Sequence, residues 1–215
     1  MKKIYVNLTN HCNLSCWFCC MSSGPDKARY IEIPKFIEIL EKEKPDITQL
    51  EGGEPLCHPD FLLLLGLATK YSKKEVVIDT NGILLEKFID SIVKISEIYQ
   101  KIITIKPSFN EILEGRLDNL KLLLSSLDFL EYIRYEINVR GKNEEELEKY
   151  RKELGWLGEK ANYHLFNSYG RLSGKSEYPK LQIENVWSEW GVYSSGGDYF
   201  ERDLIKRAVD EEQSK

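Results

Sequence analysis

The sequence has no cysteine after Cys57, although it holds five cysteines among its 215 residues. Four of the five fall between Cys12 and Cys20, whereas a disulfide framework spreads its cysteines along the chain. A second metal cluster bound only by cysteines of this chain is excluded, because Cys20 and Cys57 together cannot supply its ligands. The clustered thiols predict a single metal site near the start of the chain.

Long apolar runs are also missing. The most apolar stretch, residues 61–68, is far shorter than the roughly 20 residues that cross a bilayer, and it predicts a buried helix. The first eight residues lack the apolar run and the cleavage site of a secretory signal. We therefore expect a cytoplasmic location and no membrane partner.

No segment carries charge of a single sign. The 30 basic and 35 acidic residues are mixed along the chain and give a net charge of -5. Proteins usually bind the phosphate backbone of nucleic acids through a cluster of basic residues. Because this sequence has no such cluster, we expect no nucleic acid as a partner. With 42% hydrophobic residues, the chain can bury one sizeable core.

Short β-branched runs alternate with segments of helical periodicity, which is typical of βα units around a parallel sheet. Pro34 suits a first helical turn, and Asn143 followed by Glu146 predicts a capped helix. A closed eight-unit barrel takes about 250 residues, so this shorter chain predicts an α/β fold with a partial, open (β/α)6 TIM-like barrel and a parallel sheet. The predicted strands are residues 3–8, 46–50, 75–79, 101–106, 132–139 and 162–166.

The βα pattern stops after the last of these strands. Residues 1–171 are predicted to form the barrel core, and residues 172–215 a short C-terminal tail. The tail is rich in aromatic residues and ends in a predicted helix, residues 200–212, which we expect to pack on the core.

Three of the clustered cysteines, Cys12, Cys16 and Cys19, have the spacing Cys-x3-Cys-x2-Cys. Three thiolates on one short loop can bind three corners of an iron–sulfur cubane and leave the fourth iron open for chemistry. The alternative is a structural zinc site, which is normally closed by four protein ligands. The fourth zinc ligand would come from His11, Cys20, Cys57 or His58.

This spacing, with Phe18 directly before the third cysteine, resembles the signature loop of radical S-adenosylmethionine (SAM) enzymes. The resemblance implies a [4Fe–4S] cluster on Cys12, Cys16 and Cys19, whose open iron binds the amine and the carboxylate of SAM. It also implies that Phe18 packs near the adenine of SAM.

One βα unit later, Gly52, Gly53, Glu54 and Pro55 closely resemble the motif with which this family binds the SAM amine. Paired glycines allow a backbone to approach a ligand closely, and a carboxylate accepts hydrogen bonds from an ammonium group. Taken without the cysteine loop, the same residues would be interpreted as an ordinary turn.

Further candidates lie at the ends of later strands. The Thr-Asn-Gly turn at residues 80–82 resembles one in peptide-modifying and cofactor-building members, and we assign no contact to it. Ser108 and Asn110 resemble the positions that bind the ribose and carboxylate of SAM, although members often have an acid in place of Asn110. Asn138 and Arg140 end the fifth strand, and Arg140 suits either the SAM carboxylate or a solvated surface. Parallel barrels build active sites at the carboxyl ends of strands, so these residues are expected to share one rim.

The resemblance implies an enzyme that reductively cleaves SAM at the cluster and abstracts a substrate hydrogen with the resulting 5′-deoxyadenosyl radical. An electron donor such as flavodoxin or ferredoxin would then be a partner. The strand-end turns, together with Gly170-Arg171, favour a peptide, a natural-product intermediate or another small molecule as substrate, although no cysteine-rich extension of the SPASM type follows. Two alternatives stay open: a zinc-stabilised module that binds a small ligand, and a cluster-binding regulator without turnover.

Overall fold

The computed structural model describes residues 1–166, Arg171 and the backbone of residues 190–193. Within these residues, the strands form a parallel sheet in the order β7-β6-β4-β3-β2-β1-β8, and β5 also pairs with β4. The strands are β1 (Lys3–Thr9), β2 (Ile47–Gly52), β3 (Glu75–Thr80), β4 (Ile102–Phe109), β5 (Ile133–Tyr135), β6 (Ile137–Gly141), β7 (Ala161–Leu165) and β8 (Trp190–Tyr193).

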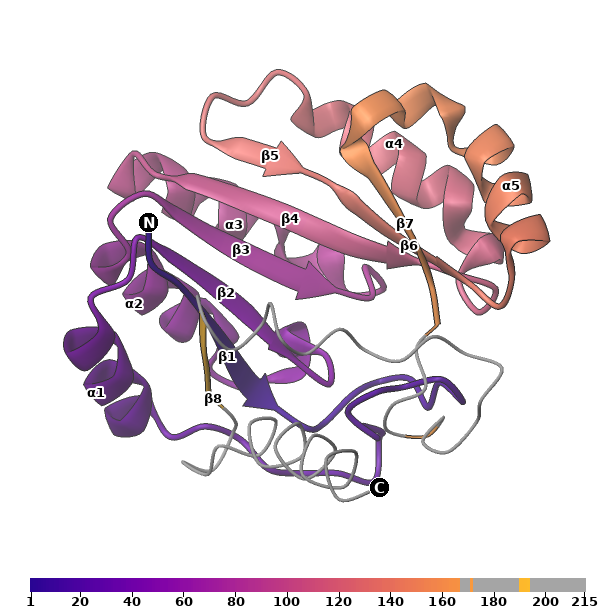
Figure 1. Ribbon diagram of the computed structural model, residues 1–215. Coiled ribbons are helices and arrows are strands. Elements are labelled where there is room, and N and C mark those ends of the chain that lie inside the picture. Colours follow the sequence, from indigo (N-terminus) through magenta and orange to yellow (C-terminus); the bar gives the residue numbers. More distant parts are fainter. Residues whose placement is uncertain (167–170, 172–189, 194–215) are drawn as a thin grey trace.

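The helices lie along one side of the curved sheet (Figure 1). They are α1 (Ile33–Glu43), α2 (Phe61–Tyr71), α3 (Leu85–Tyr99), α4 (Leu117–Leu127) and α5 (Glu144–Glu153), with short 3-10 helices at Pro55–Cys57, Glu114–Arg116 and Gly155–Lys160. The cap of α5 is as predicted, since the Asn143 side chain accepts a hydrogen bond from the backbone N–H of Glu146.

The main core lies between the sheet and these helices. Every second residue of a strand points to the same face, and the alternating residues of β1, Ile4, Val6 and Leu8, are fully buried in this core. Phe36 of α1 and Phe61 of α2 are buried in the same cluster. Burying each such side chain stabilises the fold by about 1.5–3 kcal/mol, which fixes the curvature of the sheet and therefore the position of its rim.

The opposite, inner face of the sheet is polar. It includes Lys3 on β1, Gln49 and Glu51 on β2, and Asp79 on β3, all of which alternate with core residues. The filled interior of a closed TIM barrel is dominated by Val, Ile and Leu. The composition of this inner face therefore fits an open barrel whose hollow faces a polar ligand or water.

The predicted α/β fold with an open, partial parallel barrel is confirmed. One predicted strand, residues 132–139, is divided into β5 and β6 at Glu136. The two pieces keep the same register against β4, and the interruption lies opposite Lys106 and Pro107. Proline has no N–H to donate to a neighbouring strand, which explains the gap in the ladder.

The tail contributes a strand that the sequence did not predict. Residues 190–193 form β8, which pairs in parallel with β1 at the edge opposite β7. The predicted helix at residues 200–212 lies outside the described residues, and the proposed domain boundary at residue 171 stays a prediction.

Candidate metal and SAM site

The three spaced cysteines lie on the loop that follows β1. The backbone N–H of Cys12 donates to the carbonyl of Gly24 at 3.2 Å, and the N–H of Cys19 donates to the carbonyl of Cys16 at the same distance. The Cys12 sulfur also accepts a hydrogen bond from the N–H of Leu14 at 3.4 Å. The loop is therefore a folded unit that holds its thiols on one short stretch of chain.

The thiols influence one another. Burial raises the pKa of Cys12 to about 12, with smaller contributions in the same direction from Glu54 and from the thiols of Cys16 and Cys19, while the N–H of Leu14 lowers it. Burial likewise raises the pKa of Cys16 to about 11, although the Arg171 guanidinium acts in the opposite direction. Thiolates grouped away from water need a positive centre to stabilise them, and iron supplies such a centre.

The loop does not form a compact site for a single ion. Zinc binds sulfur at about 2.3 Å in a tetrahedron, which holds its ligand atoms roughly 4 Å from one another. Among the described residues, no three His, Cys, Asp or Glu side chains form a group that could hold a metal ion. In a [4Fe–4S] cluster, each of three thiolates would bind a different iron.

The paired glycines bring two loops into backbone contact. A Cβ added to Gly53 would overlap the carbonyl oxygen of His11 and lie 2.7 Å from its carbonyl carbon. A Cβ on Gly52, whose φ is +140°, would overlap the carbonyl oxygen of Thr9. The N–H groups of Gly53 and Glu54 donate to these same two carbonyls, at 2.7 and 2.9 Å. The glycines therefore let the loop after β2 bind the start of the cysteine loop.

The Glu54 side chain is fully buried and ties two loops together, its own and the turn after β3. Its carboxylate accepts hydrogen bonds from the Leu56 N–H, the Thr80 hydroxyl and the Asn81 N–H, at 3.2, 2.7 and 2.7 Å. Burial raises the pKa of this carboxyl to about 7, and the three hydrogen bonds partly offset the effect. The Thr-Asn-Gly turn, to which the sequence assigned no contact, is thus the partner of the glutamate.

Asn81 extends this connection to the metal site. Its side-chain nitrogen donates to the Asn13 side-chain oxygen at 2.7 Å and approaches the Cys12 sulfur at 3.8 Å. A hydrogen bond to a ligating sulfur is one way in which a protein adjusts an iron–sulfur cluster. The sequence gave no signal for this contact, because the two residues lie 69 positions apart.

Arg171 holds the far end of the cysteine loop. Its guanidinium donates to the Ser15 hydroxyl at 3.1 Å and to the carbonyls of Cys16 and Ser23, both at 2.6 Å. Its own N–H donates to the Cys19 carbonyl at 3.1 Å. The rigid fork of arginine suits several acceptors at once, so this one residue fixes the loop around two of the three thiols.

Phe18 is held by aromatic packing. Its ring stacks on Phe166, with centroids 4.0 Å apart and an angle of 17° between the planes. Trp17 meets both rings edge-on at 5.4 Å. Phe18 is thus held in an aromatic cluster within the loop that carries the thiols.

The other predicted SAM residues gather on the β4 and β6 side of the rim. Ser108 pairs in register with Asn138, and Arg140 lies two residues further along the same face. The Asn138 amide donates to Asp79 at 3.1 Å. Asn110 is buried, and its side-chain oxygen accepts a hydrogen bond from the N–H of Ile112, so it closes the turn after β4.

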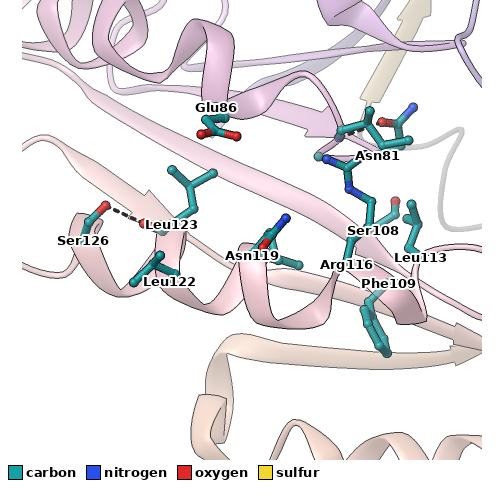
Figure 2. A pocket seen from close by; sticks show the side chains of 13 residues that line it. Asn81, Glu86, Ser108, Phe109, Leu113, Arg116, Asn119, Leu122, Leu123 and Ser126 are labelled. Carbon is teal, nitrogen blue, oxygen red and sulfur yellow. Dashed lines mark hydrogen bonds between the residues drawn. The ribbon is translucent and has the colours of Figure 1, made fainter.

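A cavity of about 350 Å³ opens beside this rim (Figure 2). Asn81 and Ser108 belong to its lining, and Figure 2 shows Asn119 and Leu123 of α4 pointing toward the side where Glu86 of α3 lies. The cavity has apolar and polar walls, as small-molecule sites commonly have. Most of its lining comes from α4 and the segment before it, so it extends from the ends of β3 and β4 along the helices.

The open parallel α/β barrel and the three-thiol loop at the carboxyl ends of its strands together indicate the class of this protein. The family model described as the radical SAM superfamily matches residues 6–154, which is more than half of the sequence. The chain belongs to the radical SAM superfamily. Its cofactors are accordingly a [4Fe–4S] cluster and SAM.

Several curated proteins share part of this sequence. The chain is 34% identical over 89 residues to the probable GTP 3′,8-cyclase of Sulfurisphaera tokodaii, which covers 40% of this chain and 28% of that protein. It is 26% identical over 178 residues to the antilisterial bacteriocin subtilosin biosynthesis protein AlbA of Bacillus subtilis, covering 76% and 39%. The chain therefore spans well under half the length of these two relatives.

Solved structures share the fold. The crystal structure of Streptococcus suis SuiB bound to S-adenosylmethionine matches with a TM-score of 0.60 and 17% identity, covering 92% of this chain and 51% of that chain. SuiB bound to the precursor peptide SuiA matches with a TM-score of 0.61, 17% identity, and coverage of 92% and 49%. Among the described helices of this chain, none has the length and apolar character needed to cross a bilayer.

Proposed function

We propose that this chain is a radical SAM enzyme that holds its [4Fe–4S] cluster through Cys12, Cys16 and Cys19 and acts on a peptide. The observation that carries the proposal is the cysteine loop, which holds the three spaced cysteines on one short stretch of chain and is itself held by Asn81 and Arg171. Three thiolates bind three irons and leave one iron for SAM.

When bound, the cluster and SAM supply a 5′-deoxyadenosyl radical that abstracts a hydrogen atom from the substrate. The protein residues position these groups and exclude water. Cys12 is buried and Phe18 stacks on Phe166, and an electron donor such as flavodoxin or ferredoxin would deliver the electron.

In this proposal the residues of the rim would hold SAM. Gly52, Gly53 and Glu54 form the turn for its amine, where Glu54 acts by holding the turn through its buried carboxylate. Arg140 pairs with the SAM carboxylate, since a guanidinium binds a carboxylate through two parallel hydrogen bonds. Phe18 packs near the adenine, and Ser108, Asn110 and Asn138 bind the ribose and carboxylate groups.

A peptide substrate is supported by two relatives. AlbA is described as a protein of subtilosin biosynthesis, and SuiB has been solved with the precursor peptide SuiA. AlbA is aligned over 76% of this chain. The metal content of the purified chain distinguishes this proposal from the zinc-module alternative.

The test compares two sets of cysteine variants after purification without oxygen. We expect the Cys12→Ala, Cys16→Ala, Cys19→Ala variant to lose iron, sulfide and the formation of 5′-deoxyadenosine from SAM under reduction. The matched control is the Cys20→Ala, Cys57→Ala variant, which should keep about four iron and four sulfide per chain.

Retention of the full iron content by the triple variant would contradict the proposal. One zinc and no colour in the unaltered chain would support the zinc-binding module instead. A normal cluster without any 5′-deoxyadenosine would support the regulator.

A further inference from the structure

Two carboxylates meet on the inner face of the barrel, one strand apart. Glu51 of β2 lies beside Asp79 of β3. The amide nitrogen of Gln49 donates a hydrogen bond to each of them, and its distance to the Glu51 oxygen is 2.5 Å. The second oxygen of Asp79 accepts a hydrogen bond from Asn138 at 3.1 Å. None of these contacts belongs to the metal loop or to the Gly-Gly-Glu motif.

The remaining atom of this group lacks a partner. The side-chain oxygen of Gln49 is buried, in a residue only 6% exposed, and no described residue donates a hydrogen bond to it. The amide cannot be turned around, because its oxygen would then face two carboxylates. A buried acceptor without a donor costs about 1–3 kcal/mol, so a ligand N–H at this position would be favourable.

The two acids have few cations available to them once the other partners of those cations are taken into account. Burial raises the pKa of Asp79, while the hydrogen bond from Glu51 and the charges of Lys106 and Arg140 lower it. Lys106 already forms an ion pair with Glu136 at 2.7 Å. In the proposed function Arg140 pairs with the SAM carboxylate, which leaves Lys3 as the remaining neighbouring cation of the two acids.

We propose that Gln49, Glu51 and Asp79 bind a cationic N–H-rich group of the substrate, an ammonium or a guanidinium on the side chain of a peptide. The inference rests on the proposed function, which makes the inner face of the barrel the substrate chamber. Two carboxylates and one amide oxygen offer acceptors to several N–H donors at once, and charge-assisted hydrogen bonds are the strong ones.

Other occupants fit less well. A neutral amide would satisfy the Gln49 oxygen but would bring no charge to the two carboxyl groups. A divalent cation is disfavoured because Lys3 and Lys106 stand nearby, and no three His, Cys, Asp or Glu side chains of the described residues form a group for an ion. An organic cation needs only the acceptors that are present.

The inference is tested by measuring, with anaerobic calorimetry, how tightly small probes bind to the reconstituted full chain in the presence of SAM. The probes are the Nα-acetyl N-methylamides of lysine, arginine and norleucine, the last of which has the same stem without the charge. We expect the lysine or arginine probe to bind at least about tenfold more tightly than the norleucine probe. The Asp79→Asn, Glu51→Gln variant should lose this preference, whereas Asp90→Asn, a change of an exposed acid on α3, should keep it.

Equal binding of the three probes, failure of both cationic probes to bind, or an unchanged preference in the double variant would overturn the inference. If the double variant does not fold, the comparison of probes on the unaltered chain still decides. Iron, sulfide and 5′-deoxyadenosine are measured on the same preparation. Intact SAM cleavage without a preference for cations refutes this inference alone, while loss of the cluster in the unaltered chain refutes the proposed function.

Discussion

The two halves of the barrel rim use their polar groups differently. Around β1 to β3 the loops bind one another, through Glu54, Asn81 and Arg171. On the side of β4 and β6, the Ser108 hydroxyl and the Arg140 guanidinium make no hydrogen bond or ion pair with the residues that the structure describes. The half around β1 to β3 is thus held together by contacts within the protein. In the half around β4 and β6, the Ser108 hydroxyl and the Arg140 guanidinium can donate hydrogen bonds to a ligand. This difference is what a fixed metal site beside a reversible ligand site requires.

The largest effect should follow from a change that separates the interlocked loops. Gly53→Ala places a methyl group against the His11 carbonyl, where backbone and not a flexible side chain must give way. We expect the free energy of unfolding to fall by more than about 3 kcal/mol, measured by chemical denaturation. Gly66→Ala is the matched control, because nothing lies within 4 Å of its added Cβ. It should stabilise α2 by about 0.5–1 kcal/mol, and equal losses in both variants would refute the interlocking.

A smaller effect should follow when the clamp on the cysteine loop is weakened. Arg171→Lys keeps the charge but loses the fork that serves three acceptors. We expect the cluster to bleach several times faster in air, with little change in overall stability. The loss of visible absorbance measures the bleaching rate. Arg134→Lys, an exposed position on β5, is the control. Equal bleaching rates in the two variants would show that the clamp does not protect the cluster.

On the open half, a substitution should affect ligand binding and leave the fold unchanged. Arg140→Gln removes the guanidinium proposed to hold the SAM carboxylate. We expect the Kd for SAM to rise about tenfold, by anaerobic calorimetry, with the free energy of unfolding unchanged within about 0.5 kcal/mol. A stability loss as large as that of Gly53→Ala would abolish the distinction between the two halves.

The smallest expected effect is a pH dependence on the interlocked half. His58 is buried, its Nε2 lies 3.2 Å from the Ile31 carbonyl, and its Nδ1 accepts the Asp60 N–H at 3.0 Å. Burial lowers the pKa of this imidazole below 6.5, so the unfolded chain binds a proton more readily than the folded chain. Stability from this group is therefore present above pH 6.5 and is lost as the pH falls below it.

Denaturation at pH 7.5 and pH 5.5 measures this dependence. We expect the difference between the two stabilities to shrink by about 1 kcal/mol or less in His58→Gln. Because other groups titrate in the same range, the comparison is made between the variant and the unaltered chain at each pH. An identical pH slope in the two proteins would show that His58 has no part in it.

The sequence predicts the features that are local along the chain. The spacing of Cys12, Cys16 and Cys19, the alternation of strands and helices, and the cap at Asn143 each involve neighbours within a few positions. The sheet also follows from such patterns, because each βα unit repeats the same arrangement. Its edge strand β8 does not, since its partner β1 lies about 190 residues earlier in the chain.

The contacts that define the site are not local, and the sequence could not predict them. The carboxylate of Glu54 reaches Asn81 across 27 positions, and Arg171 reaches Cys16 across 155. The sequence interpretation assigned the paired glycines to a ligand, whereas in the fold they first admit the backbone of Thr9 and His11. The acid pair on the inner face becomes visible only when β2 and β3 lie side by side.

Asn81 and Arg171, which contact the cysteine loop, are synthesised long after the loop itself. The three thiols proposed to bind the cluster leave the ribosome within the first 19 residues, but Asn81 and Arg171 follow much later. A nascent chain therefore exposes its thiols to oxygen and stray metals before the pocket around them exists. We expect faithful iron delivery only after the last barrel strand has been made, by a carrier that docks on a nearly complete protein.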